Sequence, residues 1–444
     1  MKKLTVILAL VFHMVVVSCL SACGGKTSET PSNESSITSE APATSETPST
    51  SETPSTDVTP AEKLQLVDTY TPAVLDKYMN PIWQTTEMYD EGGVVVGETG
   101  EIRLLRKPVA NTVVVRSVHF EETYREGIDY IVDGNVIRRI ATGNMPYFKY
   151  EEYYFDEPYQ GSQLKCDPAK AEITYEGEKY LYYSEGAAGV KNYVMISYRT
   201  TDPYTQFTPT GDSSAQNFIN KIKTEKEATI MFYGDSITEG SCASGTAFGG
   251  NANPYLPRWG ELVCEWLDQN YTAKINYLNR AQGGWTTKQG LDNFDEGQNR
   301  VGPHLDKIDM LFIAFGANDP SISDETYKQQ IMGMVDKYLA AQPDGSIVLV
   351  SPFVFNQQTS NWFINQYRFE GILEQIKAEY AASGKSNNIS VAKVYSFFNG
   401  VCETGKRSRD YLGNNINHPN DYGVRMYAQV ALKTICGEEF FPAN

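Results

Sequence analysis

Residues 229–240 read TIMFYGDSITEG. The first five form a continuous apolar run, which is the pattern of a strand buried on both faces, as in a parallel sheet. A tight turn, Gly234-Asp235-Ser236, follows directly and leads into a predicted helix. A serine in this position is exposed at the carboxyl end of a strand, and its backbone N–H can face a developing oxyanion. The stretch therefore predicts a parallel α/β fold and a candidate nucleophile, Ser236.

The residues around this stretch continue the alternation of strands and helices. Apolar runs predict further strands, and helical periodicity predicts helices between them. The strands are predicted at 275–278, 310–315, 347–350 and 391–394, and the helices at 259–267, 325–341, 363–382 and 424–435. Such alternation requires right-handed crossovers and gives a parallel sheet covered on both faces. Ligand sites in such sheets lie at the carboxyl ends of the strands.

Three more segments can converge on that edge. They read NRAQGGWT at 279–286, GAND at 316–319 and NINHPND at 415–421. The paired glycines would let a backbone N–H approach a substrate closely, and Asn318 offers an amide donor. A serine hydroxyl is a weak nucleophile and needs a base that titrates near neutral pH, which His418 supplies.

Together these four segments resemble the sequence blocks of the SGNH (GDSL-type) hydrolase superfamily over about residues 206–444. The resemblance implies a flavodoxin-like, three-layer α/β/α domain with a five-stranded parallel sheet. It also implies that Ser236 is the nucleophile and His418 the general base. Gly284 and Asn318, with the N–H of Ser236, would be the oxyanion donors. Members of this superfamily hydrolyse esters without a cofactor or a metal ion.

One position departs from the family pattern, because Asn415 stands three residues before His418 where the family usually has Asp. A carboxylate there would hold the imidazole in the correct tautomer. One interpretation is a Ser–His dyad in which a backbone carbonyl or another acceptor orients His418. In a second, Asp410 or Asp421 takes the place of the missing acid. A third is a slow or inactive enzyme, and Asn415 could itself offer its side-chain oxygen.

The preceding residues, 61–205, predict a β-sandwich. Short segments rich in Val, Ile and Tyr recur about every ten residues, and a hairpin turn is predicted at 133–135. The aromatic stretch 147–155 is either a sugar-stacking surface or a surface that packs against a neighbouring domain. A β-sandwich before an SGNH domain is similar to the architecture of carbohydrate esterase family two, acetyl esterases of plant polysaccharides that use a dyad.

The N-terminus resembles that of a bacterial lipoprotein. A basic start and an apolar run at 4–17 precede LSAC at 20–23, so residues 1–22 are interpreted as a signal peptide and Cys23 as the lipidated residue. The run is short for a membrane-spanning helix. Residues 23–60 are rich in Ser, Thr, Pro and Glu and are predicted to be a disordered linker.

The composition excludes some classes of function. The chain has 444 residues, with 38 Lys and Arg against 55 Asp and Glu, a net charge of −17. Nucleic-acid binding needs a basic face, which this balance argues against. The other cysteines, which we interpret as buried free thiols, show neither a zinc pattern nor a disulfide framework: Cys166, Cys242, Cys264, Cys402 and Cys436.

These observations predict a serine esterase that is lipid-anchored on the outer face of a bacterial membrane and removes acetyl or other short acyl groups from carbohydrate. No cofactor and no contact with the membrane beyond the lipid are expected. The alternatives are a lipid or aryl esterase and a catalytically inactive, polysaccharide-binding lipoprotein. The oligomeric state stays open.

Overall fold

The computed structural model describes residues 62–297, 299–361 and 365–441. The predicted signal peptide, Cys23 and the predicted linker lie outside these residues. All described residues belong to one compact unit. Within them, no helix combines the length and the apolar character needed to cross a membrane. We call residues 62–205 the β-rich region and the described residues from 206 to 441 the parallel-sheet region.

The parallel-sheet region is built on a five-stranded sheet in the order β11-β10-β12-β13-β14. Every neighbouring pair is parallel. The strands are β10 (Glu227–Gly234), β11 (Lys274–Asn279), β12 (Met310–Ala314), β13 (Ser346–Val350) and β14 (Ile389–Ala392). This order is that of flavodoxin-like sheets, with the switch point between β10 and β12. The predicted fold class is confirmed.

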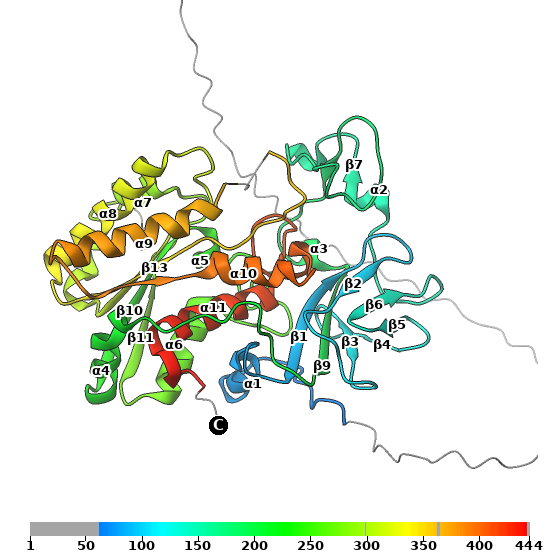
Figure 1. The fold of residues 1–444 in the computed structure, drawn as a ribbon, viewed down its shortest axis with the longest axis horizontal. Helices are drawn as coiled ribbons and strands as arrows, with labels where there is room; N and C mark the ends of the chain where they lie inside the picture. Colours follow the sequence, from blue (N-terminus) through cyan, green and yellow to red (C-terminus); the bar gives the residue numbers. More distant parts are fainter. Residues whose placement is uncertain (1–61, 298, 362–364, 442–444) are drawn as a thin grey trace, which may run out of the picture. The chain divides into compact units, whose positions relative to one another are not determined.

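Helices cover both faces of this sheet because successive strand residues point to opposite sides. Ile230 and Phe232 of β10 share an apolar cluster with one set of helices, and Met231 and Tyr233 share a second cluster with the other set. Figure 1 shows helices on either side of the sheet. The first set is α4 (Gln216–Thr224), α6 (Trp259–Asn270), α10 (Val394–Glu403) and α11 (Asp421–Cys436). The second set is α7 (Thr287–Asp292), α8 (Asp324–Ala341) and α9 (Tyr367–Ala382).

The β-rich region consists of antiparallel sheets, in the orders β1-β9-β3-β4, β2-β6-β5 and β7-β8. Its strands are β1 (Glu87–Val94), β2 (Glu101–Arg103), β3 (Val114–Ser117), β4 (Thr123–Tyr124), β5 (Tyr130–Asp133), β6 (Val136–Arg139), β7 (Tyr154–Phe155), β8 (Tyr180–Leu181) and β9 (Tyr193–Arg199). Ile102 of β2 and Ile196 of β9 are fully buried in one cluster, so the two larger sheets share a core. The predicted hairpin is present, since Asp133 pairs with Val136 around Gly134, whose φ is +62°.

Short helices complete both regions. The α-helical ones are α1 (Leu75–Met79), α2 (Tyr150–Tyr153), α3 (Ala187–Val190) and α5 (Ser236–Glu239). The 3₁₀ turns are η1 (Pro72–Val74), η2 (Tyr159–Gly161), η3 (Ser213–Ala215), η4 (Gly302–Lys307), η5 (Ser408–Tyr411) and η6 (Gly437–Glu439).

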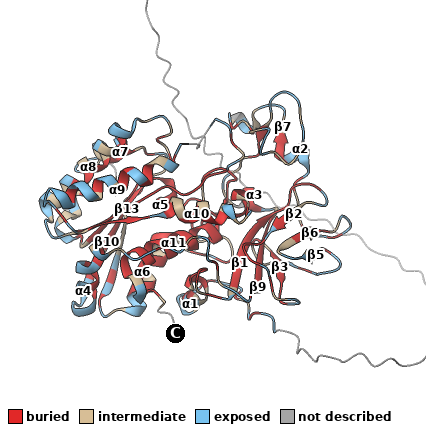
Figure 2. Cartoon of the chain, viewed as in Figure 1, coloured by how far each residue is buried: buried red, intermediate tan, exposed pale blue. Residues whose placement is uncertain are grey.

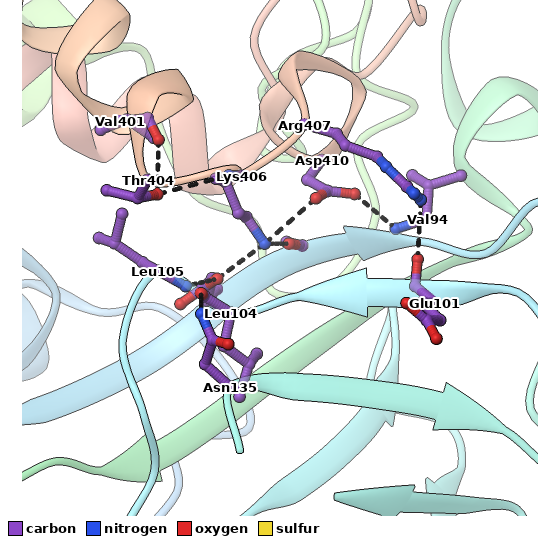
Figure 3. Close-up of polar contacts among 12 residues, drawn as sticks. Val94, Glu101, Leu104, Leu105, Asn135, Val401, Thr404, Lys406, Arg407 and Asp410 are labelled. Atoms are coloured by element: carbon purple, nitrogen blue, oxygen red, sulfur yellow. Dashed lines mark hydrogen bonds and ion pairs between the residues drawn. The ribbon is translucent and has the colours of Figure 1, made fainter. Parts of the chain in front are cut away.

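The two regions meet across a buried ionic cluster. Lys406 Nζ lies 2.7 Å from Glu91 Oε1, 3.4 Å from Asp410 Oδ2 and 2.6 Å from the carbonyl oxygen of Gly92 (Figure 3). The three charged side chains are at most 1% exposed. Asp410 also accepts a hydrogen bond from the N–H of Val94 in β1. Buried charges are tolerated only when paired and hydrogen-bonded, so this cluster fixes the β-rich region against the parallel-sheet region.

Candidate active site

Ser236 begins α5 directly after β10, at the carboxyl edge of the parallel sheet. Asp235 caps this short helix, because its side chain accepts a hydrogen bond from the N–H of Ile237. Gly240 ends the helix with a φ of 101° that favours glycine. Burial raises the pKa of Asp235 to about 7. The strand, turn and helix predicted from residues 229–240 are therefore present, and Ser236 is 6% exposed at their junction.

His418 reaches Ser236 from the loop before α11, with its Nε2 2.8 Å from Ser236 Oγ. Asn414 shapes this loop, because its Oδ1 accepts hydrogen bonds from the N–H groups of Ile416, Asn417 and His418. Such side-chain-to-backbone bonds replace the regular backbone ladder and fix a turn. The structure thus brings together the serine and histidine that the sequence singled out.

Asn415 does not orient His418, so the expectation that its own side-chain oxygen does so is wrong. Its Oδ1 accepts hydrogen bonds from the hydroxyl of Tyr153, at 2.9 Å, and from Asn356 Nδ2, at 3.2 Å. Its Nδ2 donates to the carbonyl oxygen of Tyr182, at 2.8 Å. The side chain is buried and committed to the contact with the β-rich region.

The two aspartates considered as substitutes are also engaged elsewhere. Asp410 belongs to the buried cluster with Lys406. Asp421 accepts a hydrogen bond from the N–H of Ser244, at 2.8 Å. The interpretation that one of them folds back to His418 is therefore wrong.

The group at His418 Nδ1 is Glu185, which lies in the β-rich region between β8 and α3. Nδ1 is 3.0 Å from both carboxylate oxygens. Oε1 of Glu185 accepts hydrogen bonds from Asn414 Nδ2, at 2.9 Å, and from the hydroxyl of Tyr183, at 2.8 Å. Oε2 accepts one from the thiol of Cys242, at 3.4 Å. The side chains of His418 and Glu185 are 12% and 42% exposed.

The charge of Glu185 is fixed by these neighbours. Partial desolvation opposes its ionisation, but the charge and hydrogen bond of His418, with the bonds from Asn414 and Tyr183, lower its pKa to about 2. Sequence reasoning missed Glu185 because it lies 233 residues from His418 and belongs to no recognisable motif. The one signal in the sequence was indirect, since Asn415 left His418 in need of another acceptor.

The predicted oxyanion donors lie in two loops at the same edge. Glu239 Oε2 accepts the N–H of Gly283 at 2.7 Å, and a Cβ on Gly283 would lie 3.7 Å from Ser236 Cβ. Gly284 has a φ of +78°, a left-handed conformation that suits glycine. Asn318 Nδ2 donates one hydrogen bond, to the carbonyl oxygen of Trp285, at 3.0 Å.

Within the described part of the chain, the backbone N–H groups of Ser236 and Gly284 have no hydrogen-bond acceptor. Asn318 Nδ2 carries a second hydrogen besides the one given to Trp285. These donors could therefore serve an oxyanion without breaking a bond that the protein already makes.

Glu185, Cys242 and His418 also place potential metal-ligand atoms within 4.8 Å of one another. Burial, followed by the nearby carboxylate of Glu185, holds the pKa of the Cys242 thiol well above its usual value, so the thiol keeps its proton. That proton points to Glu185. The geometry fits a hydrogen-bond network around His418 Nδ1.

The aromatic stretch predicted from the sequence and the two other described histidines make different contacts. Tyr153 and Tyr154 of the aromatic stretch are buried, and Tyr153 binds Gln358 and Asn415 of the parallel-sheet region, which supports the packing interpretation. His119 contacts the carbonyl oxygen of Asn253, and His304 contacts Arg280. The five cysteines that are described are free thiols, as predicted, and all of them except the half-buried Cys402 are buried.

A parallel sheet with a serine, a histidine and candidate oxyanion donors at its carboxyl edge is an arrangement that suits a carboxylic ester hydrolase. Residues 232–426, which lie within the parallel-sheet region, match the model of the GDSL-like Lipase/Acylhydrolase family. Comparison with curated proteins finds no match.

Several solved structures are similar to about half of the chain. A two-domain esterase active on acetylated mannans, co-crystallised with mannopentaose, is 22% identical over 50% of this chain and 53% of its own, with a TM-score of 0.39. An acetylxylan esterase from Geobacillus stearothermophilus is 20% identical over 49% of this chain and 98% of its own, with a TM-score of 0.37. A lipolytic G-D-S-L protein from Veillonella parvula is 18% identical over 47% of this chain and 98% of its own, with a TM-score of 0.32.

Proposed function

We propose that the protein is a serine esterase that hydrolyses acetyl or other short acyl esters on carbohydrate. The observation that carries the proposal is the distance of 2.8 Å between Ser236 Oγ and His418 Nε2, at the edge of the sheet where the candidate oxyanion donors also lie. In this proposal Ser236 is the nucleophile, His418 the general base, and Gly284 and Asn318 are oxyanion donors together with the N–H of Ser236.

The reaction proceeds in two stages. His418 Nε2 takes the proton of Ser236 as Oγ attacks the ester carbonyl, and the C–O bond to the alcohol breaks as His418 returns that proton to the leaving oxygen. Water then attacks the acyl-serine with His418 again as base, which releases the acid and restores Ser236. Each fixed donor to the tetrahedral oxyanion is typically worth about 2.7–4 kcal/mol of barrier.

The preference for carbohydrate esters is supported by the order of the two regions, a β-rich region before a GDSL-type domain, which is similar to carbohydrate esterase family two. Around His418 the β-rich region contributes the polar side chains of Tyr183 and Glu185. The aromatic side chain of Phe248 is 50% exposed, and the backbone of Phe248 lies beside Gly186, the residue after Glu185. Exposed rings beside polar groups suit a sugar, although an aryl ester would also fit them.

The test of this function uses residues 59–444, the compact unit, with 4-nitrophenyl esters from acetate to octanoate. We expect turnover to be highest with acetate and to fall by about 10³-fold or more in Ser236→Ala, the loss typical of a missing nucleophile. A maximum at octanoate would favour a lipid esterase. Equal rates for the wild type and Ser236→Ala would leave the inactive, polysaccharide-binding protein as the better explanation.

We also propose that the protein is exported and anchored by a lipid on Cys23. The support is the sequence alone, in which the apolar run and LSAC at 20–23 precede a polar segment. In a bacterial host, the wild type should partition with the membrane fraction, and Cys23→Ser should lose that association. A variant that stays in the membrane fraction after a high-salt wash would contradict the anchor.

A further inference from the structure

We infer that Glu185 of the β-rich region is the positioning residue for His418, so that the nucleophile, the base and the acid come from both regions of the chain. This inference rests on the proposed function. It replaces the simple Ser–His dyad by a triad of Ser236, His418 and Glu185, in which Glu185 stays ionised. It also assigns the β-rich region a part in the reaction.

The first support is the geometry at His418 Nδ1. Both oxygens of Glu185 lie 3.0 Å from Nδ1, while Nε2 faces Ser236 Oγ at 2.8 Å. An ionised carboxylate can only accept hydrogen bonds, so the proton of the neutral ring has to stand on Nδ1. Nε2 is then unprotonated and can accept the proton of Ser236.

The second support is the way the carboxylate is held. Asn414, which also fixes the backbone of the His418 loop, donates to Oε1, and so does the hydroxyl of Tyr183. Cys242 donates to Oε2. Among the described residues, these three side chains and His418 are the groups shown in hydrogen-bond contact with the carboxylate of Glu185. They keep the carboxylate ionised, and the negative charge stabilises the imidazolium that forms when His418 accepts the proton.

The third support explains the departure at position 415. Asn415 Nδ2 donates to the carbonyl oxygen of Tyr182, three residues before Glu185, and its Oδ1 accepts from Tyr153. An aspartate in this conformation would place a carboxylate oxygen against the Tyr182 carbonyl, with no proton between them. The amide at 415 is therefore suited to anchoring the segment that carries Glu185, and the acid is supplied from that segment.

The test compares Glu185→Gln with Glu185→Asp in the full-length protein. Of the two oxygens of Glu185, Oε2 makes the hydrogen bond with Nδ1, and Oε1 accepts from Asn414 and Tyr183. In Glu185→Gln these two donors favour the amide oxygen at the Oε1 position, which places the NH₂ group at the Oε2 position, against Nδ1. The ring would then carry its proton on Nε2, the wrong tautomer. We expect kcat to fall by between about 10² and 10⁴, with KM changed by less than about threefold, and Glu185→Asp to recover part of the loss.

Two readouts separate positioning from a structural role. The acid limb of the kcat/KM profile should move to lower pH in Glu185→Gln, because the anionic neighbour of His418 is gone. In ¹⁵N spectra of histidine, the neutral ring of His418 should carry its proton on Nδ1 in the wild type and on Nε2 in Glu185→Gln. The spectra need no turnover, so they test the inference even if the proposed esterase function fails. An unchanged tautomer, or a kcat within about threefold of the wild type while Ser236→Ala is inactive, would overturn it.

A second pair of variants tests the family's usual arrangement. Asn415→Asp should lower kcat by about tenfold or more, and it should not rescue Glu185→Gln in the double variant. Glu178→Gln is the matched control, because Glu178 is an exposed acid of the same region that binds Lys165. Restoration of wild-type kcat in the double variant would show that position 415 can orient His418 and would contradict the inference.

Discussion

Three asparagines have different tasks at the site, although all carry the same amide. Asn414 fixes the loop of His418 and donates to Glu185. Asn415 holds the β-rich region through Tyr182 and Tyr153. Asn318 donates to the carbonyl oxygen of Trp285 from the loop after β12. An amide can donate and accept at once, so the neighbours of each side chain decide which of these tasks it performs.

Asn318→Ala tests whether the amide of Asn318 is an oxyanion donor. Removal of one donor to a tetrahedral oxyanion typically lowers kcat by about 10²–10³-fold with little change in KM. We expect this result for 4-nitrophenyl acetate, measured by steady-state kinetics. Gln289→Ala is the control. The side chain of Gln289 accepts a hydrogen bond from the N–H of Thr286 at the start of α7. An equal effect of both variants on kcat would indicate a structural cause.

Helix α11 joins the site to the rest of the molecule. His418 precedes it, Asn420 caps it by accepting the N–H of Gly423, and Asp421 lies in its first turn. All residues of α11 are buried (Figure 2). Arg425 donates to the carbonyl oxygens of Tyr89 and Asp90 in β1, so the polar side of the helix is covered by the β-rich region.

The first turn of α11 should make stability depend on pH. Burial raises the pKa of Asp421 from 3.8 to about 6, although Ser244, Arg425 and His119 favour the ionised form. Because the folded-state pKa is the higher one, the free energy of unfolding should fall as the pH rises from about 4 to about 6. Denaturant titrations at pH about 4.5 and about 8 should show a smaller difference for Asp421→Asn than for the wild type. An equal difference in both proteins would contradict this assignment.

At the scale of the whole molecule, the two regions behave as one structure because charged groups are buried between them. Besides the cluster of Lys406, Glu91 and Asp410, Arg409 is 1% exposed and pairs with Glu172 of the β-rich region. Arg407 donates to the carbonyl oxygen of Glu101 (Figure 3). It also pairs with the carboxylate of Glu172. Separation of the regions would break these buried ion pairs and expose their charges to water. It would also move Glu185 away from His418.

Lys406→Met should therefore destabilise the whole unit by about 3–5 kcal/mol, because it leaves two buried carboxylates without their cation. The free energy of unfolding from urea titration measures this. The matched control is Lys406→Met combined with Glu91→Gln and Asp410→Asn, which removes all three charges and should recover much of the loss. A single variant as stable as the wild type would show that the cluster does not hold the regions together.

The sequence predicted those parts of the site that local patterns encode. The apolar run before Gly234 identified β10 and placed Ser236 at the carboxyl edge of a parallel sheet, and the resemblance of residues 415–421 to a family block identified His418. Gly284 and Asn318 were predicted from the segments that follow two other strands. Glu185 and the partners of Asn415 could not be predicted in this way, because their contacts join segments that are distant in the chain and carry no shared period.

The sequence by itself determined the parallel sheet, its order of elements and the two residues whose side chains meet at 2.8 Å. The sheet and the turn at Ser236 follow from hydrophobic periodicity and from turn chemistry, which act over a few neighbouring residues. His418 was identified from the resemblance of its segment to a family block. Only the tertiary structure decided what lies at His418 Nδ1. Packing of the β-rich region over α11 and the 414–418 loop places Glu185 there and turns Asn415 away, and such packing depends on the shape and charge of both surfaces together.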